Sequence, residues 1–512
     1  MKYLLGVDTG STMTKAALFD VEGRQIAVAG RKVEVSSPHP GWRELDPERL
    51  WQLTAEAIAE VVQKAGIQAR DIVGIATSGA GDGGYWLDAQ CQPVRPAIQS
   101  SDGRAFALAE ELEKSVGPQI RSLGGFGPGG WETTVIALWL KRNEPDVCQR
   151  IKHVAITKDY IKYRLTGVLN SDVTDSVDAG FVEQKGFTYS QEILDLFGVP
   201  ELMETLPPFT ESWEVVGQVT LEAAALTGLE AGTPVASGVH DCEACELGSG
   251  GIHPGDLVVI AGTWNLNLLL VPRLITEGGA TSARTAMPGV FSVTSIGGTS
   301  AANLEWFITQ CCGDERAQAK AEGKSVYDIC NALVAGLPPA GLDIIYHPFL
   351  HVHGGDVPLN AKAGFFGISG WHTKAHLLRA LYEGVTFAHR AAIEPQRQMG
   401  LPIGQARLTG GAAKSPVWSQ MFADVLDTPL AVVEADEVGA LGAALCAGVA
   451  AGVYKDIPDA VAKAVRVARN HTPDAQATAI YLERYDVYRY LVDVMQEPWG
   501  RLAALGQAPA GH

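Results

Sequence analysis

The chain has 512 residues, with 58 acidic and 40 basic side chains and a formal net charge of −18. At roughly 100–200 residues per domain, this length predicts two large domains or three small ones, each with its own core. Phosphate backbones are bound mainly through Lys and Arg, so the charge argues against a nucleic-acid-binding protein. An anionic ligand would have to be held locally by backbone amides, a metal ion or a few cations. The 57 glycines exceed the average usage of roughly 7% and predict many tight turns.

The cellular compartment is indicated by cysteine usage and by hydrophobic runs. The eight cysteines are few and irregularly spaced, which favours reduced thiols in a cytoplasmic protein over a disulfide framework. Asp8 interrupts the apolar N-terminal run before the hydrophobic region of a secretion signal could form. The uncharged stretch 438–454 is slightly short for a membrane span and rich in Ala and Gly, so we expect a closely packed internal helix there.

Short β-branched runs alternate with longer amphipathic stretches along most of the chain, a pattern typical of an α/β protein. Residues 3–7 and 15–19 are predicted strands joined by the turn 8–12, and 48–66 has helical periodicity, followed by a buried strand at 72–77. The other elements expected in the first half are helices at 110–114 and 134–142, strands at 154–156 and 234–239, and a helix entered at Lys158.

The glycine-rich segment 248–255 is the expected boundary, which divides the chain into domains 1–250 and 251–512. A closing helix is expected at 475–497, and only 503–512 is expected to be disordered. The elements expected between are the hairpin 256–270, helices at 301–310, 373–399, 416–425 and 438–454, and strands at 344–348, 405–409 and 430–433.

The hairpin 256–270 repeats the opening of the chain, since both have an apolar strand, a tight turn containing Gly and Thr, and a second apolar strand. Two such hairpins, about 250 residues apart, suggest two similarly built domains facing each other. Two unrelated hairpins are the alternative, and the pattern alone leaves both open.

The first candidate site is the turn after the first strand, which contains Ser11 and Thr12 and is followed by Lys15. Successive N–H groups and hydroxyls in such a turn form a concavity suited to phosphate oxygens. Asp8, at the end of the buried strand, is placed to hold a hydrated Mg²⁺ ion. The alternative is a hairpin turn whose Asp and Thr cap the backbone.

The second candidate is Asp241, where a predicted strand gives way to a helix. A carboxylate at such a point faces the mouth of an α/β cleft and can accept the proton of a substrate hydroxyl in phosphoryl transfer. A plain helix N-cap is the alternative. Cys242 and Cys245 form a single C-x-x-C with His240 nearby, and packed free thiols are favoured over a zinc or redox site because further ligands and a thioredoxin-like context are missing.

Two glycine turns complete the set of candidates. Gly410 and Gly411 follow a predicted strand and precede a helix, which lets a flat or phosphorylated ligand touch the backbone, although a plain helix-entry turn explains them as well. Gly81 and Asp82 lie in a second glycine turn, 79–84, where a carboxylate can accept hydrogen bonds from two hydroxyls of a sugar or polyol. A solvated turn residue is the alternative for Asp82.

Taken together in this order, these motifs resemble the FGGY family of carbohydrate kinases over essentially the whole chain. The matching segments are GVDTGSTMTKAALFD (6–20), HPGWRELDPERLW (39–51), SDGRA (101–105), KDYIKYRLTG (158–167), SGVHDCEA (237–244), AGTWN (261–265), NLEWF (303–307), AGFFGI (363–368), LTGGAAKSPVWSQMFADVL (408–426) and EADEVGALGAAL (434–445). The resemblance implies two actin-like (ribonuclease H-like) domains flanking a deep catalytic cleft, with the sugar bound mainly by the first and ATP mainly by the second.

Residue roles follow from the resemblance position by position. It implies that Asp241 is the general base, that Asp8 orients Mg²⁺ with Asp241 beside it, and that ATP is the phosphoryl donor. The residues implied to contact ATP are Ser11, Thr12, Lys15, Gly262, Thr263, Gly410, Gly411 and Ser415, and those implied to contact the substrate are Gly81, Asp82, Asp102, Trp131 and His240. Many members of the family are dimers, so the resemblance is compatible with a homodimer, although the sequence itself does not determine the oligomeric state.

The substrate class is indicated by the loops that depart from the D-xylulose kinase pattern. Asp82 stands where those enzymes have a His, and Ser100 where the family usually has a Trp. The motifs SSDGR, GTWN and NLEWF resemble L-xylulose kinases, which favours a ketopentose, while a small polyol such as erythritol or a pentitol is the alternative. The added carboxylate favours a neutral substrate over a sugar acid. A non-catalytic sugar or nucleotide sensor on the same fold is an alternative of another class, disfavoured by the presence of both Asp8 and Asp241.

Overall fold

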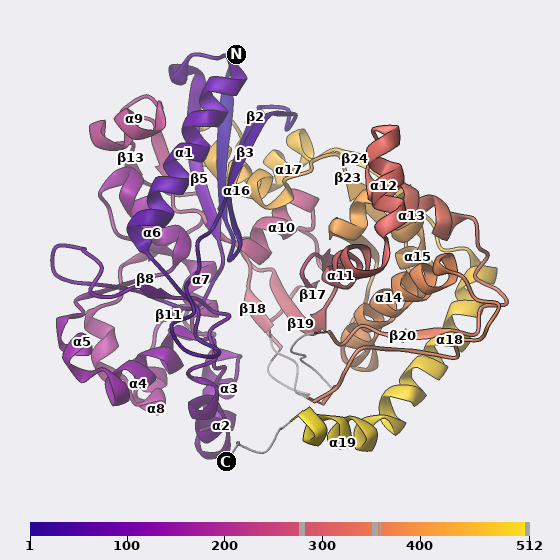
Figure 1. The fold of residues 1–512 in the computed structure, drawn as a ribbon. Helices are drawn as coiled ribbons and strands as arrows, with labels where there is room; N and C mark the ends of the chain where they lie inside the picture. Colours follow the sequence, from indigo (N-terminus) through magenta and orange to yellow (C-terminus); the bar gives the residue numbers. More distant parts are fainter. Residues whose placement is uncertain (276–281, 351–356, 359, 507–512) are drawn as a thin grey trace. The chain divides into compact units, whose positions relative to one another are not determined.

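The computed structural model describes residues 1–275, 282–350, 357–358 and 360–506. The chain forms two compact units (Figure 1). Unit 1 contains Met1–Pro254, Leu270–Val293 and Glu434–Arg466, and unit 2 contains Gly255–Leu269, Thr294–Val433 and Val467–His512. Each unit is therefore made of several segments of the chain. For example, the Gly/Ala-rich segment near the C-terminus packs within unit 1.

Unit 1 is built on a seven-stranded sheet with the strand order β13-β14-β5-β1-β2-β3, in which β15 also pairs with β5. β1 is antiparallel to β2 and parallel to β5, which confirms the predicted opening hairpin. The strands of this sheet are β1 (Tyr3–Thr9), β2 (Met13–Asp20), β3 (Gln25–Lys32), β5 (Ile72–Gly79), β13 (Val215–Gln218), β14 (Pro234–Ala236) and β15 (Val239–His240).

The strand predicted at 234–239 is two strands, β14 and β15, which are separated by Ser237 and Gly238. Gly238 has φ of 85°, and a Cβ at this position would lie 2.2 Å from the carbonyl oxygen of Thr77. This left-handed, tightly packed residue breaks the strand because only glycine adopts such a conformation without strain. The break matters for function, since β15 leads directly into the helix that carries Asp241.

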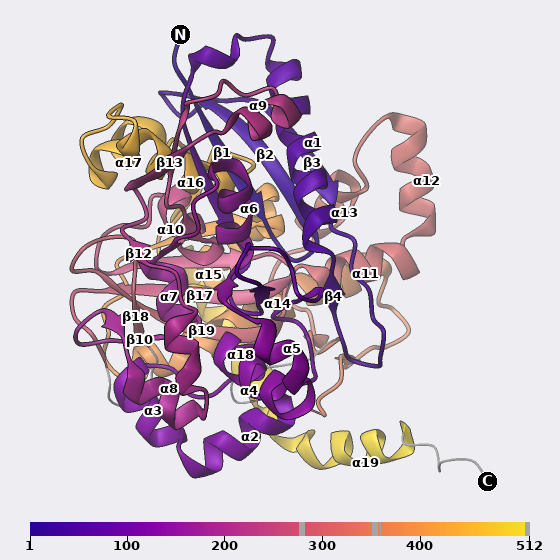
Figure 2. The same cartoon turned by 90° about the vertical axis from the view of Figure 1, so that its left-hand side faces the viewer.

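Helices α1 (Pro47–Ala65) and α16 (Val438–Ala450) pack on the sheet of unit 1. Asp46 caps α1 by accepting a hydrogen bond from the Glu48 N–H, and Gly66 ends it with φ of 63°. Figure 2 shows α16 next to β1. A Cβ on Gly6 would lie 1.8 Å from the Ala440 carbonyl oxygen, so β1 and α16 approach as closely as glycine and alanine allow. The predicted internal helix is thereby confirmed.

Unit 1 also contains a second apolar core around Trp86, Val135 and Phe197, to which some of its remaining elements contribute. The short strands are β4 (Glu44–Leu45), β6 (Tyr85–Leu87), β7 (Ala97–Ile98), β8 (His153–Ala155), β9 (Ser171–Asp172), β10 (Val182–Glu183), β11 (Thr188–Tyr189) and β12 (Phe209–Thr210). The helices are α2 (Phe106–Ser115), α3 (Gly117–Gly124), α4 (Thr133–Asn143), α5 (Pro145–Arg150), α6 (Thr157–Thr166), α7 (Val173–Asp178), α8 (Gln191–Phe197), α9 (Leu221–Thr227), α10 (Asp241–Ser249) and α17 (Ile457–Ala464).

A second seven-stranded sheet has the order β18-β19-β17-β16-β22-β23-β24. In it β16 pairs antiparallel with β17 and parallel with β22, β22 is parallel to β23, and β23 is antiparallel to β24. The first sheet has the same sequence of pairings from β2 through β1, β5 and β14 to β13. This shared topology supports the duplication suggested by the two hairpins. The strands are β16 (Asp256–Ala261), β17 (Trp264–Val271), β18 (Ser282–Arg284), β19 (Phe291–Thr299), β22 (Gln405–Gly410), β23 (Leu430–Val433) and β24 (Val467–His471).

Unit 2 contains the helices predicted at 301–310, 373–399 and 416–425, and also two helices between 313 and 335 that were not predicted. The closing helix expected at 475–497 is α18 (Ala475–Val494), and a further helix, α19 (Gln496–Gly506), follows it. Pro498 lacks the N–H that would bond back to Val494, so α18 cannot simply continue. Residues 503–506, expected to be disordered, are the end of α19, and 507–512 lie outside the described residues. The other elements are α11 (Ala302–Cys311), α12 (Gly313–Glu322), α13 (Val326–Ala335), β20 (Ile345–His347), β21 (Gly364–Phe366), α14 (Lys374–Gln398) and α15 (Pro416–Leu426).

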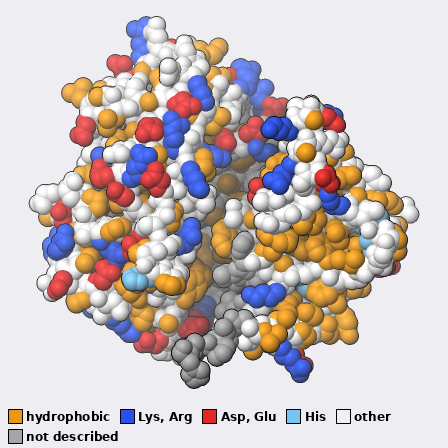
Figure 3. All heavy atoms as spheres, in the orientation of Figure 1, with side chains coloured by type: hydrophobic (Ala, Val, Ile, Leu, Met, Phe, Trp, Pro, Cys, Tyr) orange, Lys and Arg blue, Asp and Glu red, His pale blue; other side chains and the backbone are white. Residues whose placement is uncertain are grey.

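The surface of each unit differs in character on the face drawn in Figure 3. Charged side chains of both signs are interspersed over unit 1, whereas unit 2 has broader hydrophobic areas around α14 and β20. Among the described residues, no helix combines the length and the apolar character that crossing a bilayer requires.

Candidate active site

Asp241 is the first residue of α10, immediately after β15. The N-cap residue is His240, and no side chain caps this helix end. The Asp241 carboxylate is therefore not a cap, and its side chain remains 35% exposed. The predicted strand-to-helix position is confirmed, and a partly exposed carboxylate there is free to act on a ligand.

Asp8 lies near the carboxyl end of β1 and is paired in register with Ser78 of β5. The Ser78 hydroxyl donates to Asp8 Oδ1 at 2.8 Å. Burial and the nearby charge of Asp241 raise the pKa of Asp8 to about 6. β15 also pairs in parallel with β5, so the ends of all three strands meet at one edge of the sheet, where ligands of open α/β sheets bind. The two predicted carboxylates are thus neighbours within unit 1.

The glycine turn 79–84 follows β5 and adds Gly81 and Asp82 to the same edge. A Cβ on Gly81 would lie 2.5 Å from His240 Nε2 and 2.9 Å from an oxygen of Asp178. The Gly83 N–H donates to the Trp131 carbonyl at 3.0 Å, which joins this turn to the loop of Trp131, whose side chain is 42% exposed. The predicted substrate contacts Gly81, Asp82, Trp131 and His240 are brought together.

The electrostatics of this pocket are dominated by carboxyl groups. Burial, together with the charges of Asp178 and Glu132, raises the pKa of Asp82 well above its usual value. Burial and Asp178 likewise raise the pKa of Glu132. Asp82 Oδ1 is buried and has no hydrogen-bond partner among the described residues. A buried acceptor or acid group without a partner costs free energy unless a ligand or water completes it, so Asp82 is available to a substrate.

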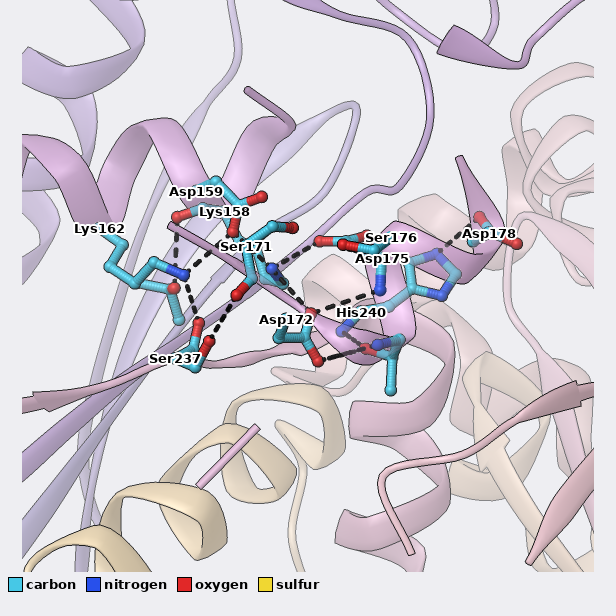
Figure 4. Close-up of polar contacts among 12 residues, drawn as sticks. Lys158, Asp159, Lys162, Ser171, Asp172, Asp175, Ser176, Asp178, Ser237 and His240 are labelled. Atoms are coloured by element: carbon cyan, nitrogen blue, oxygen red, sulfur yellow. Dashed lines mark hydrogen bonds and ion pairs between the residues drawn. The ribbon is translucent and has the colours of Figure 1, made fainter. Parts of the chain in front are cut away.

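His240 is held on three sides. Its Nδ1 lies 2.6 Å from Glu243 Oε2 and its Nε2 lies 3.3 Å from Asp241 Oδ1. Its backbone N–H donates to the Thr174 hydroxyl at 2.9 Å. Asp178 lies 3.6 Å from Nε2 (Figure 4). Burial opposes a charge on the ring, but the carboxylates of Asp178, Glu243 and Asp241 outweigh it and raise the pKa of His240 well above its usual value.

A buried ion-pair network lies next to His240, as Figure 4 shows. The Lys158 ammonium is 2.6 Å from Asp159, 2.9 Å from Asp172 and 2.8 Å from Asp175. Lys162 donates to Asp159 and to the Ser237 carbonyl. In the sequence analysis Lys158 marks only the start of a helix. A sign of the network is nevertheless present in the sequence, because the two lysines of α6 are followed by acidic residues at positions 172, 175 and 178.

The first turn also carries the residues expected near phosphates. The Gly10 N–H bonds the Met13 carbonyl and closes the turn, while the carbonyl of Ser11 accepts from the Gln99 amide. Thr12 is exposed. Lys15 extends to Glu437, with 2.8 Å between Nζ and the carboxylate. Its ammonium is therefore shared with an acid.

A small cavity within unit 1 lies between this first turn and the glycine turn 79–84. Its walls are Thr9, Gly10, Ser11, Val33, Leu45, Leu50, Ala80, Gly81, Asp82, Tyr85, Ile98, Gln99, Ser100 and Thr157. Both candidate turns therefore border one hollow.

In unit 2 the two predicted glycine turns are adjacent. Ala261 pairs with Gly410 at the ends of β16 and β22, and a Cβ on Gly410 would lie 2.8 Å from the Gly262 nitrogen. Thr263, Gly410 and Gly411 are exposed. This backbone surface is open to a ligand, as expected for a nucleotide site.

Two predicted contact residues have geometry that favours a structural role. Asp102 is 1% exposed, and its two oxygens accept from Arg104 and from the Arg43 N–H. Ser415 caps α15 by accepting from the Trp418 N–H, and it donates to Asn331. Because these polar atoms are already bonded, we leave both residues out of the proposed ligand contacts.

The same architecture is found in solved structures. A xylulose kinase from Rhodospirillum rubrum matches with a TM-score of 0.83 and 29% identity, over 98% of this chain and 100% of that one. A ligand-bound xylulose kinase from Lactobacillus acidophilus shares the fold, with a TM-score of 0.86 at 21% identity over 98% and 100% of the two chains. The fold is therefore that of the sugar kinases with two actin-like domains.

The chain belongs to the FGGY family of carbohydrate kinases, whose N-terminal domain matches residues 3–248 and whose C-terminal domain matches residues 257–451. It is 34% identical to the L-xylulose/3-keto-L-gulonate kinase of Escherichia coli K12, over 97% of each chain. It is 30% identical to the xylulose kinase of the same organism, over 95% of this chain and 98% of that one. The protein is thus an ATP-dependent sugar kinase.

Proposed function

We propose that the protein transfers the γ-phosphoryl group of ATP to a terminal hydroxyl of a neutral ketopentose of the xylulose type, with Asp241 as general base. The observation that carries this proposal is the partly exposed Asp241 carboxylate at the start of α10, at the same sheet edge as Asp8 and the Gly81–Asp82 turn. The relatives named for L-xylulose and xylulose support the ketopentose.

The chemistry asks little of the protein beyond placement and proton transfer. Asp241 accepts the proton of the attacking sugar hydroxyl as its oxygen forms a bond to the γ-phosphorus, and the bond from phosphorus to the β-phosphate oxygen breaks. The products are a sugar phosphate and ADP. Asp82, with an uncompleted buried oxygen, and the exposed face of Trp131 would hold the rest of the sugar.

The donor set fits Mg²⁺, which prefers carboxylate oxygens and water. Burial and the nearby charge of Asp241 raise the pKa of Asp8, so a cation at this place would stabilise the charged carboxylates. The backbone of α16 also lies close to Asp8, since a Cβ on Gly439 would lie 2.9 Å from Asp8 Oδ2. When bound with ATP, Mg²⁺ would neutralise charge on the phosphates. Asp8 and Asp241 would be its protein contacts.

The proposed nucleotide contacts of unit 2 are the glycine turns at Gly262–Thr263 and Gly410–Gly411. Those of unit 1 are Ser11 and Thr12. Exposed backbone N–H groups and hydroxyls bind phosphate without many cations. This explains how a chain with a net charge of −18 can bind a triphosphate.

Selection for a neutral acceptor follows from the carboxyl groups around Asp82. The same burial and the same charges of Asp178 and Glu132 that raise the pKa of Asp82 would act on a carboxylate of the substrate. An anionic acceptor should therefore bind poorly. The relative named for 3-keto-L-gulonate makes that sugar acid the most informative competitor.

The test is a coupled assay of ADP release over L-xylulose, D-xylulose, erythritol, pentitols, glycerol and 3-keto-L-gulonate. We expect a ketopentose to have the highest kcat/KM and 3-keto-L-gulonate to be at least about tenfold worse than L-xylulose. Asp241→Asn should lower kcat by at least about 100-fold while ATP still binds, and the exposed Asp195→Asn on α8 is the matched control. Substantial turnover by Asp241→Asn would overturn the base assignment, and a preference for a polyol or for the sugar acid would overturn the substrate class.

A further inference from the structure

Glu243 is a buried carboxylate that touches the proposed machinery only through another residue. It lies one turn after His240 on α10, it is 7% exposed, and its Oε2 is 2.6 Å from His240 Nδ1. At this distance the Nδ1–H group donates a short, charge-assisted hydrogen bond to the carboxylate. This hydrogen bond fixes the plane of the imidazole ring, and it thereby also fixes the direction of Nε2 on the opposite edge.

The opposite edge of the ring faces the proposed base. His240 Nε2 is 3.3 Å from Asp241 Oδ1, and the Cys242 thiol donates to the same oxygen at 3.2 Å. Among the described residues, Asp241 Oδ2 has no such contact. The carboxylate is thus held by one oxygen while the other is left for the substrate hydroxyl.

The ring cannot relax out of this position easily. Gly81 lies against Nε2, so closely that a Cβ would come within 2.5 Å, and Thr174 holds the His240 backbone. A histidine confined in this way transmits the orientation set at Nδ1 to the group at Nε2, as the outer partners of ligating or catalytic histidines do.

We propose that Glu243 is a positioning residue that, through His240, orients Asp241 for proton abstraction. This inference rests on the proposed function, in which Asp241 is the base. Glu243 would then contribute to kcat without touching the substrate. A misplaced base lowers the rate by up to about 100-fold even when binding is unchanged.

The experiment measures kcat and both KM values for Glu243→Ala and Glu243→Gln, with melting temperatures for each. We expect Glu243→Ala to lower kcat about 10- to 100-fold with the KM values for ATP and sugar changed less than about twofold. Glu243→Gln, which keeps an acceptor for Nδ1–H, should recover most of the loss. Glu246→Gln is the matched control, since Glu246 is another buried Glu of α10 and should retain wild-type kcat.

A double-mutant cycle with His240→Gln tests whether the effect passes through the ring. If it does, adding Glu243→Ala to His240→Gln should cost no further activity. The proposal is overturned if Glu243→Ala keeps wild-type kcat, if Glu243→Gln falls as far as Glu243→Ala, or if the two losses add fully. Asp241→Asn, measured alongside, separates the two levels. If it stays active the base itself is wrong, whereas an inactive Asp241→Asn with an unaffected Glu243→Ala refutes only the role of Glu243.

Discussion

Gly81 and His240 are in direct contact: the space that a Cβ on Gly81 would need lies 2.5 Å from Nε2 of the imidazole. The contact joins the turn after β5 to the start of α10, two segments far apart in the sequence. A larger residue at position 81 would collide with His240, so packing requires glycine there. The backbone conformation does not require it, since φ of Gly81 is not in the left-handed region.

Replacing Gly81 by Ala should disturb the site without unfolding the protein. The added methyl must displace His240 or the nearby Asp178, which lies 2.9 Å from the same point. We expect kcat/KM for the sugar to fall by about tenfold or more, measured by ADP release. Gly313→Ala is the matched control, because nothing lies within 4 Å of a Cβ at Gly313. Equal activity in the two variants would contradict the packing argument.

Asp82 has φ of 59°, a left-handed conformation that Asn tolerates well and Ala does not. Asp82→Asn should therefore keep both the turn and a polar contact, and raise the sugar KM only a few-fold. Asp82→Ala loses the polar contact and adds strain, so we expect the sugar KM to rise at least about tenfold. Steady-state kinetics with sugar and ATP varied separately make the test, and an unchanged sugar KM in both variants would show that Asp82 does not contact the sugar.

Lys158 neutralises Asp159, Asp172 and Asp175 in a fully buried cluster. Replacing it by Met leaves these carboxylates without their cation, and removing one partner of a buried ion pair typically costs about 3–5 kcal/mol. We expect a correspondingly lower urea midpoint for Lys158→Met. Lys141→Met removes a surface pair with Glu201 and should cost about 1 kcal/mol or less. Similar midpoints for the two variants would contradict the burial argument.

His389 makes unit 2 sensitive to acid. Its Nδ1 donates to Asn267 Oδ1 and its Nε2 accepts from the Ser300 hydroxyl, both at 2.8 Å. This pairing uses the neutral ring, and burial lowers the pKa of His389 to about 3. The unfolded chain takes up this proton first, near pH 6.5, so the free energy of unfolding falls as the pH drops from about 6.5 towards 3.

At pH 5 the loss from His389 is about 2 kcal/mol relative to pH 8. Urea midpoints at pH 8 and pH 5 measure it. His389→Gln lacks the titrating group, so its midpoint should change less between the two pH values even though the variant starts from a lower stability. An identical pH dependence in the wild type and the variant would rule out His389 as the source.

Several features were predictable because short-range rules govern them. The opening hairpin, the helix at 48–66 and the strand-to-helix position of Asp241 follow from alternation, helical periodicity and turn chemistry. The break at Gly238 and the helices α12, α13 and α19 were not predicted. At Gly238 a single Gly interrupts an otherwise continuous apolar strand pattern, and periodicity does not register it.

The resemblance of motifs predicts ligand contacts residue by residue, and the structure shows what each of these side chains bonds within the protein. Asp102 and Ser415 lie in the expected segments, yet their polar atoms are bonded within the protein. Lys158 and Glu243 were not singled out, because a charged residue in a helix normally faces solvent. Only the fold shows that both are buried against opposite charges.

By itself, the sequence determined the α/β class, the two hairpins, the family and the identity of the carboxylates at the ends of the strands, since these depend on neighbours along the chain and on motif order. The tertiary structure decided that α16 packs on β1, that Gly81 lies against His240 and that Glu243 bonds the histidine next to the proposed base. These contacts depend on close packing between segments that are distant in the sequence. In such packing, one additional Cβ or one unpaired buried charge changes which arrangement is stable.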